Sequence, residues 1–456
     1  MFHRRKLISA VSSITQFRMA LVASAFFAGV VGSPEEVFSQ DLDYRGVATA
    51  RVAVETNTGE LQLSELLIEP EVSGSLGDKI DITVVGRLRF DPADEIEPGN
   101  PMSQSDIRSA VNRRLFIGDV LDFELREAFA DIHLGDWFLR LGKQQVVWGQ
   151  ADGLRVLDQV NPLSFREFIL GDFEDRRIPL WTVNAERTFG PVTVQLLWIP
   201  DHTFNEIPDD GTFAPSSPIF VPNIPTTITT PIRVETADRP NKFFRDDDFG
   251  VRLNGFTKGW DWSLNALYAF GDNQVFRRET LPNETILTPE FERTFLIGGS
   301  ASNAFGKATL RTEIGYTSDR FILTDAPADR DGIFETEEIS TVIGLDYQVN
   351  AELLLSGQLF TGILTDQGNE LVRDQVTATT SLLIRKNLRN NTIILDGLFL
   401  QDFNNGDGLA QLSASYQLSD TMTLRAGLDV FYGDNQGVFG QFGSSDRILF
   451  SIERTF

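Results

Sequence analysis

The sequence contains no cysteine, only 4 methionines and no long apolar run among its 456 residues. The absence of cysteine excludes disulfide bonds and is compatible with passage through an oxidising periplasm, where unpaired thiols are a liability. The longest apolar stretch, Met19 to Val31, has 13 residues, which is too short to span a membrane as a helix. A high count of glycine (37) and phenylalanine (36) beside so little methionine favours turn-rich β structure with aromatic girdles over a helical protein.

Basic residues are also scarce, because 40 lysines and arginines face 65 acidic residues and give a net charge of -25. Nucleic acid is therefore not an expected partner, since binding it requires a basic surface.

The N-terminus has the order of a secretory signal peptide. Arg4, Arg5, Lys6 and Arg18 precede the apolar stretch, and small residues follow it. We expect cleavage between about residues 32 and 40, so that residues 1–40 are a signal peptide with a short N-terminal segment and residues 41–456 form one domain. An uncleaved amphipathic N-terminal helix is the alternative.

Segments of about ten residues with period-two alternation recur from Leu42 to the end of the chain. In Lys79 to Phe90 the apolar residues face one way and the charged residues the other, and Thr421 to Tyr432 repeats this pattern. Short links with Gly, Asn, Asp or Pro alternate with long links, among them 91–120, 149–177, 201–245, 271–290 and 320–335. The sequence therefore predicts an all-β, transmembrane, antiparallel up-and-down β-barrel of about 18 strands, or 16 if the first hairpin is not in the wall. A soluble β-sandwich or β-helix is the alternative, because soluble antiparallel sheets also alternate.

The last strand, Ile448 to Phe456, alternates up to a terminal phenylalanine. Such an ending resembles the closing strand of bacterial outer-membrane barrels, so Phe456 is the predicted assembly signal. Arg454 departs from the pattern and is expected at the periplasmic rim, where a long cationic side chain can reach the headgroups. The predicted location is the bacterial outer membrane, with lipid, lipopolysaccharide and the barrel assembly machinery as partners.

Arginines fall at positions that the alternation places inside the barrel. A cationic lining would prefer anionic solutes, but the same residues could form cross-strand pairs with carboxylates that brace the wall. The predicted pore-wall residues are Arg51, Arg87, Arg89, Arg252, Arg311, Arg385 and Arg425.

The long link after Trp148 is the predicted site of selectivity. Its apolar residues are expected to anchor an ordered loop, which either folds into the lumen as a constriction or covers the mouth as an outward lid. These anchors are Leu154, Val156, Leu157, Val160, Leu163, Phe165, Phe168 and Ile169. The predicted constriction residues are Arg140, Gln144, Trp148, Arg155, Asp158, Asn161, Arg166, Glu174, Asp175, Arg176 and Arg177.

Four motifs in this region carry a family resemblance: R-L-G-K-Q-Q-V-V-W-G (140–149), V-L-D-Q-V-N-P-L (156–163), D-R-R-I-P (175–179) and L-L-W-I-P (196–200). In these motifs the chain resembles a proteobacterial porin-like family of outer-membrane proteins of unknown function. The resemblance implies a β-barrel channel for small, including hydrophobic or aromatic, compounds.

The predicted function is an outer-membrane channel for passive or substrate-selective diffusion of small solutes, either anionic or aromatic. A structural or adhesin-type barrel with a filled lumen is the alternative. An outer-membrane hydrolase is less favoured, because the two histidines beyond the signal region, His133 and His202, are expected on opposite sides of the membrane. No enzymatic activity, cofactor or metal is predicted, and a homo-oligomer stays open.

Overall fold

A computed structural model describes residues 42–99, 104–221, 230–237, 239–324, 326, 329–368 and 370–456. The predicted signal peptide and its cleavage region lie outside these residues.

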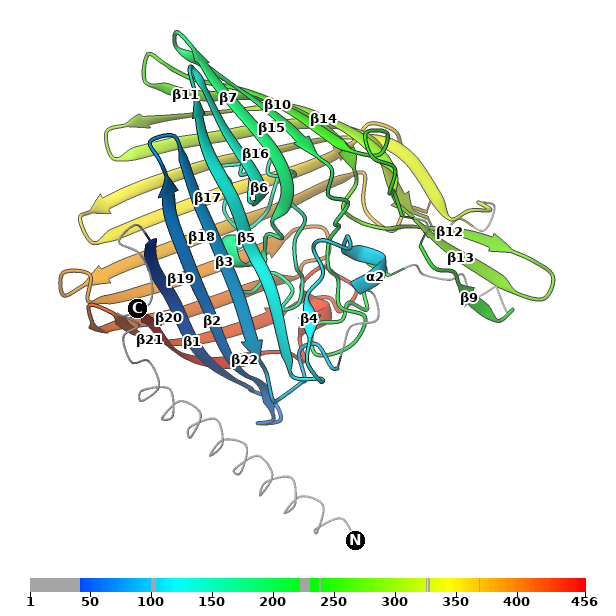
Figure 1. Cartoon of the computed structure of the whole chain (residues 1–456). Coiled ribbons are helices and arrows are strands. Elements are labelled where there is room, and N and C mark those ends of the chain that lie inside the picture. The colour runs from blue at the N-terminus through cyan, green and yellow to red at the C-terminus, as the bar shows by residue number, and fades with distance from the viewer. Residues whose placement is uncertain are drawn as a thin grey trace, which may run out of the picture.

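The described chain forms one closed antiparallel barrel (Figure 1). Its main sheet has nineteen strands, and all but the two-residue β4 (Leu115–Phe116) belong to the wall, which leaves eighteen. The wall strands are β1 (Leu42–Glu55), β2 (Leu61–Leu76), β3 (Ile80–Phe90), β5 (Leu121–Leu134), β6 (Trp137–Gln144), β7 (Leu180–Phe189), β8 (Val192–Ile199), β10 (Asp248–Thr257), β11 (Trp260–Phe270), β14 (Arg293–Phe305), β15 (Ala308–Leu323), β16 (Ile333–Asn350), β17 (Leu353–Leu364), β18 (Val376–Leu388), β19 (Ile393–Asp402), β20 (Gly408–Ser419), β21 (Met422–Tyr432) and β22 (Arg447–Thr455).

The first and last strands close the wall. β1 pairs with β22 from Val47↔Thr455 to Glu55↔Arg447 and with β2 on its other side. The first hairpin is thus part of the wall, so the prediction of about 18 strands is confirmed and the alternative of 16 is not needed.

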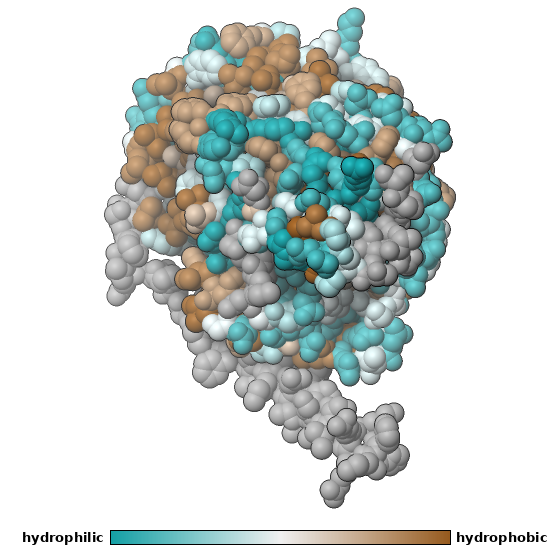
Figure 2. Space-filling model, turned by 90° about the vertical axis from the view of Figure 1, so that its right-hand side faces the viewer, coloured by the Kyte–Doolittle hydropathy of each residue, from teal (hydrophilic) through white to brown (hydrophobic). Residues whose placement is uncertain are grey.

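Turn chemistry divides the two ends of the barrel as predicted. Two-residue turns such as Lys258-Gly259 link the strands at one end, and both of these residues have a positive φ (52° and 89°), as a tight hairpin turn requires. Long links lie at the other end, which Figure 2 shows with hydrophilic side chains over most of its middle and hydrophobic ones toward its upper and left-hand margin. We call these the turn end and the loop end.

The two faces of the wall differ in polarity as the alternation predicts. On β11, Leu264 is 55% exposed, whereas Ser263 and Asn265 on either side of it are buried. Polar side chains buried inside and apolar side chains exposed outside are the reverse of a soluble protein and fit a barrel surrounded by lipid.

The remaining elements lie at the loop end or in the lumen. Helices α2 (Gln104–Ile107), α3 (Phe173–Arg176) and η1 (Gly440–Phe442) are short. No helix among the described residues is long and apolar enough to cross a bilayer. A small sheet of β9 (Ile232–Val234), β12 (Val275–Thr280) and β13 (Thr285–Glu290) projects from the barrel (Figure 1).

Two expected links differ from the structure. The link predicted at 320–335 is shorter, because β15 resumes pairing with β16 at Arg320↔Thr336 after a register shift and continues to Leu323. The long link predicted at 271–290 is present and contains the β12–β13 hairpin, which was not predicted.

Candidate functional site

The link between β6 and β7, residues 145–179, enters the barrel, and we call it the lumen segment. β6 ends at Gln144 and β7 begins at Leu180, so the link begins four residues earlier and ends two residues later than the predicted 149–177. The chain leaves the wall early because the amide of Val146 donates to the Asn161 side chain (2.7 Å) inside the barrel.

One end of the lumen segment packs on the wall formed by β7 to β17. The indole of Trp148 is completely buried, and its Nε1 donates to Oε1 of Gln195 on β8 (2.8 Å). Its ring lies over Gly250 of β10, where a Cβ would come within 2.8 Å of it. The cluster also contains Val146, Val156, Leu157, Val160, Leu180, Leu197, Ile199, Leu267, Leu296, Val342 and Phe360.

The middle of the segment packs on the opposite wall. Phe168 is buried against Phe442 (ring centroids 4.5 Å apart) and Phe431 of β21 (6.2 Å). This second cluster also includes Ala53, Leu63, Leu400 and Leu409 from β1, β2, β19 and β20. The lumen segment therefore crosses the barrel interior between two facing walls, which is the inward arrangement and not the outward lid.

Polar contacts hold the folded shape of the segment. Asp158 accepts hydrogen bonds from the amide of Trp148 (3.2 Å) and from Arg177 (2.6 Å). Asn161 donates to the carbonyl of Ile178 (2.9 Å), and Arg155 donates to the carbonyl of Asn161 (2.7 Å). These bonds join the start of the segment to its end, so it is an ordered structure.

A continuous ion-pair network fixes the segment to the wall on the β21 to β5 side. Glu167 pairs with Arg51 (2.7 Å) and Arg447 (2.8 Å), and Arg166 pairs with Glu65 (3.0 Å) and Asp91 (2.8 Å). From Glu65 the network continues in order through Arg89, Asp122, Arg114, Glu206, Arg108 and Glu124. From Arg447 it continues to Asp429.

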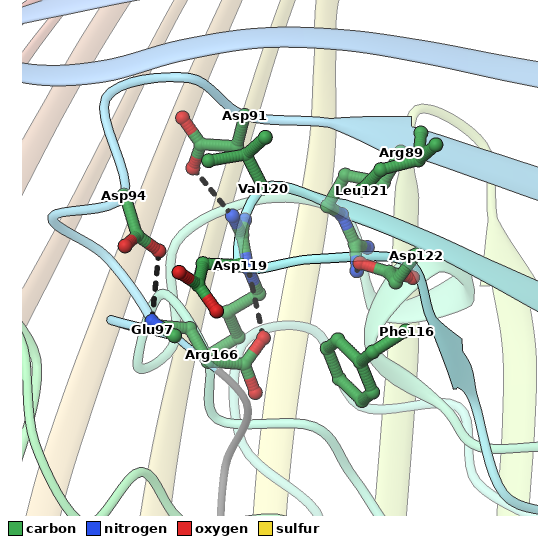
Figure 3. Close-up of a pocket in the computed structure, with 11 residues that line it drawn as sticks. Arg89, Asp91, Asp94, Glu97, Phe116, Asp119, Val120, Leu121, Asp122 and Arg166 are labelled. Atoms are coloured by element: carbon green, nitrogen blue, oxygen red, sulfur yellow. Dashed lines mark hydrogen bonds and ion pairs between the residues drawn. The ribbon is translucent and has the colours of Figure 1, made fainter.

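Figure 3 shows the part of this network that borders a small pocket below the 91–120 link. Arg166 lies between the carboxylates of Asp91 and Glu97 (2.8 and 3.5 Å), while Arg89 and Asp122 approach from β3 and β5. The cavity of about 20 Å³ has room for about one water molecule. It is a gap in the network and not a solute site.

The loop-end part of the network lowers the pKa of Glu206. Burial alone would raise the pKa of Glu206, but the guanidinium groups of Arg108 (3.0 Å) and Arg114 (2.8 Å) outweigh it and lower this pKa to about 2. Glu206 is thus a carboxylate at every physiological pH.

The predicted constriction residues divide into two groups. Trp148, Arg155, Asp158, Asn161, Arg166, Glu174, Asp175, Arg176 and Arg177 belong to the lumen segment. Gln144 is buried at its start, where its Nε2 donates to the carbonyl of Thr182 (3.0 Å). Arg140 lies nearer the turn end, paired with Asp131 (2.6 Å) over the ring of Phe129.

Five of the predicted pore-wall arginines pair with carboxylates. Arg51 and Arg89 join the network, and Arg87 reaches Glu69 (2.8 Å) and Asp175 of the segment (2.9 Å). Arg311 pairs with Asp152 and Asp346, and Arg385 pairs with Asp396.

The two other arginines bond to neutral groups. Arg252 donates to the carbonyl of Val147 (3.1 Å), and Arg425 donates to the Ser413 hydroxyl (3.2 Å). The wall arginines therefore do not form a free cationic lining.

Several members of the network were not identified from the sequence. Glu65, Glu206 and Arg447 are buried; Glu65 pairs with three arginines and each of the others with two partners, yet the partners come from other strands or loops. The only available signal was their polarity at inward positions or beside buried anchors.

The two histidines lie where they were expected. His133 is at the turn end of β5, and His202 follows β8 at the loop end. In the described ranges, no cluster of three or more His, Asp or Glu could hold a metal ion.

A closed barrel with an apolar outer surface and an inward-folded link defines a transmembrane β-barrel protein of the bacterial outer membrane. A family model matches residues 117–360, just over half of the chain, and the chain belongs to that family, which is described as "Protein of unknown function (DUF1302)". No curated protein matches the sequence.

Solved structures of two Pseudomonas aeruginosa proteins share the fold. The chain is similar to OpdK with vanillate (10% identity, TM-score 0.51, covering 92% of this chain and 100% of that one). It is also similar to OccK2 (OpdF) in complex with glucuronate (10% identity, TM-score 0.50, covering 92% and 99%). At this identity the similarity concerns the fold alone.

Proposed function

We propose that this protein is an outer-membrane channel through which small organic solutes diffuse, and that the lumen segment sets what passes. The observation that carries the proposal is the placement of residues 145–179 across an eighteen-strand barrel, anchored on two facing walls. A barrel of this size encloses a lumen wide enough for an aqueous path, and a segment across it narrows that path.

We infer that this channel selects by size and shape more than by the sign of charge. A circle of charged side chains around a pore selects permeants by sign only where nearby opposite charges do not cancel its field. Most of the wall arginines are paired with carboxylates, and the exposed charges on the lumen segment and the wall have both signs, for example Asp172 and Glu174 on the segment and Arg425 on β21. The anion preference considered from the sequence would thus depend on few residues.

Small aromatic or sugar-like acids are the solutes to examine first. OpdK and OccK2, which share the fold, were solved with vanillate and glucuronate. In this chain Phe129 and Phe138 share the face of β5 and β6 that carries Arg140, whose guanidinium lies 4.1 Å from the Phe129 ring centroid. Ring surface of this kind suits an aromatic solute, and because Asp131 pairs with Arg140 (2.6 Å) the site does not require the solute to carry a negative charge.

A liposome-swelling assay with the purified barrel tests the channel function. Solutes of graded size and charge should enter at rates that fall steeply with size, and a benzoate-type acid and its neutral amide should differ little. Single-channel reversal potentials in a salt gradient should lie near zero. A strong preference for either sign would contradict selection by size, and no permeation by any solute would contradict the channel.

A barrel with a filled lumen is the second candidate, and the observation that favours it is the same double anchoring. Two apolar clusters and an ion-pair network across the interior would also hold a permanent plug. The swelling assay separates the two functions, because a plugged barrel admits no solute.

A further inference from the structure

Residues 241–247, which directly precede β10, pack against the outer face of β8. Trp198 points outward from β8, because Gln195, Leu197 and Ile199 alternate inward and are buried. The ring of Phe244 stacks on Trp198, with centroids 5.2 Å apart and an interplanar angle of 6°.

Phe243 completes this cluster of three rings. It meets Trp198 edge-on at 5.5 Å and Phe244 at 4.3 Å. Phe243 and Phe244 are nevertheless 62% and 64% exposed, so the cluster presents apolar surface outward.

The exposed rings are held there by specific bonds. Asp246 accepts from the amides of Asn241 (3.0 Å) and Lys242 (2.9 Å) and closes the turn. The indole of Trp198 donates to the buried carboxylate of Asp247 (2.6 Å). Phe244 has a φ of 63°, a conformation rare for a bulky residue. A turn fixed in this way, with its apolar side chains outward, indicates a contact surface.

Strand register places the cluster at the edge of the lipid-facing belt. Trp198 is the direct partner of Phe249, Phe249 of Tyr268, and Tyr268 of Phe295, so one aromatic row runs across β8, β10, β11 and β14. The last three rings are exposed. Aromatic rows of this kind mark the level at which lipid tails give way to headgroups.

Cations lie beside the rings, although the whole chain is strongly acidic. Lys242 and Arg245 flank the two phenylalanines and are exposed; the Arg245 side chain is 72% exposed, although its Nε lies 3.4 Å from the Asp246 carboxylate. Asp247 and Asp248 are turned away, since Trp198 and Arg293 bind them. The surface therefore offers rings to acyl chains and two cations to phosphate groups.

We propose that Lys242 to Arg245, with Trp198, form a binding site for a phosphorylated glycolipid of the outer leaflet, that is, the lipid A part of lipopolysaccharide. The phosphates bind Lys242 and Arg245, and the acyl chains lie along Phe243, Phe244 and the aromatic row. This site is independent of the channel function, because it lies on the outer face of the wall.

The test is native mass spectrometry of the full barrel in detergent, titrated with bisphosphorylated lipid A, dephosphorylated lipid A or phosphatidylglycerol. The wild type should bind bisphosphorylated lipid A about tenfold more tightly than the other two lipids. The variant K242Q/R245Q should lose this difference, and F243S/F244S should weaken binding of every lipid.

Matched controls use exposed residues elsewhere, F403S at the loop end and R389Q at the turn end, and both should bind like the wild type. Heat-dependent migration in gels checks that each variant is a folded barrel. Equal binding of dephosphorylated lipid A or phosphatidylglycerol to the wild type would overturn the assignment, as would folded K242Q/R245Q that keeps the wild-type preference.

Discussion

Trp148 is the side chain whose removal should release the lumen segment most selectively. Among the residues that the structure describes it is the largest fully buried side chain, it belongs to the segment and not to the wall, and it contacts the wall through Gln195 and Gly250. A Trp148→Ala substitution deletes this anchor and leaves every strand pairing of the barrel intact.

The expected size of the effect follows from the contacts. A buried tryptophan hides roughly 200 Å² of apolar surface, which at about 25 cal/mol per Å² amounts to about 5 kcal/mol. Measured losses for such truncations are about 3–5 kcal/mol. We therefore expect the ratio of docked to undocked segment to fall by roughly a thousandfold, since each 1.4 kcal/mol is about a factor of ten.

The assay is single-channel recording in planar bilayers. Trp148→Ala should give a larger conductance or frequent steps between two levels, whereas Trp148→Phe, which keeps a ring and loses one hydrogen bond, should stay close to the wild type. Gly250→Val should reproduce the alanine phenotype from the wall side, because a Cβ there lies 2.8 Å from the indole. A folded Trp148→Ala barrel with unchanged conductance and noise would refute the role of the segment as the constriction.

Two further predictions concern Glu206 at the loop end and the contact between the first and last strands, β1 and β22. Because Arg108 and Arg114 hold the pKa of Glu206 near 2, below its usual 4.5, the stabilisation from this carboxylate is complete above about pH 4.5 and is lost as the pH falls toward 2. Channel noise should rise as the pH falls from about 4.5 toward 2, and Glu206→Gln should show the raised noise already at pH 6; a variant as quiet as the wild type at pH 6 would contradict this. Where β1 meets the end of β22, a Cβ on Gly46 would lie 2.5 Å from Cζ of Phe456. Gly46→Ala should therefore lower the temperature at which the folded gel band disappears. The decrease should be smaller when Phe456 is also replaced by alanine. Equal losses in both backgrounds would show that the ring does not occupy this space.

Alternation predicted the wall because it depends on local sequence. In β3, for example, Val84 is exposed and Arg87 buried, as the pattern Lys79 to Phe90 requires. The closing pair of strands could be expected as well, since an up-and-down barrel leaves its first and last strands to pair. The reading of Phe456 by the assembly machinery stays a prediction, although its backbone does pair with Gly46 (2.9 and 3.0 Å).

The end of β6 could not be read from the same pattern. Gln145, Val146 and Val147 would continue a strand equally well. Val146 instead packs in the buried apolar cluster around Trp148, and its amide donates to Asn161, fifteen residues later. Apolar alternation is thus compatible with either a lipid-facing wall or a buried lumen core, and only a distant partner decides between them.

The sign of the charge presented to the lumen is the property that the local sequence predicts least well. Alternation places Arg51 and Arg89 inside, but their field depends on carboxylates that arrive from other strands and from the loops, such as Glu65, Glu167 and Asp122. A buried arginine without such a partner would be costly, so inward arginines in a narrow, segment-filled lumen imply inward carboxylates. Arg252 and Arg425 are the exceptions, because each bonds only to a neutral group, and Arg425 is the more exposed of the two. Arg425 is therefore the inward arginine whose neutralisation should shift a reversal potential most, whereas neutralising Arg51 should chiefly loosen the segment.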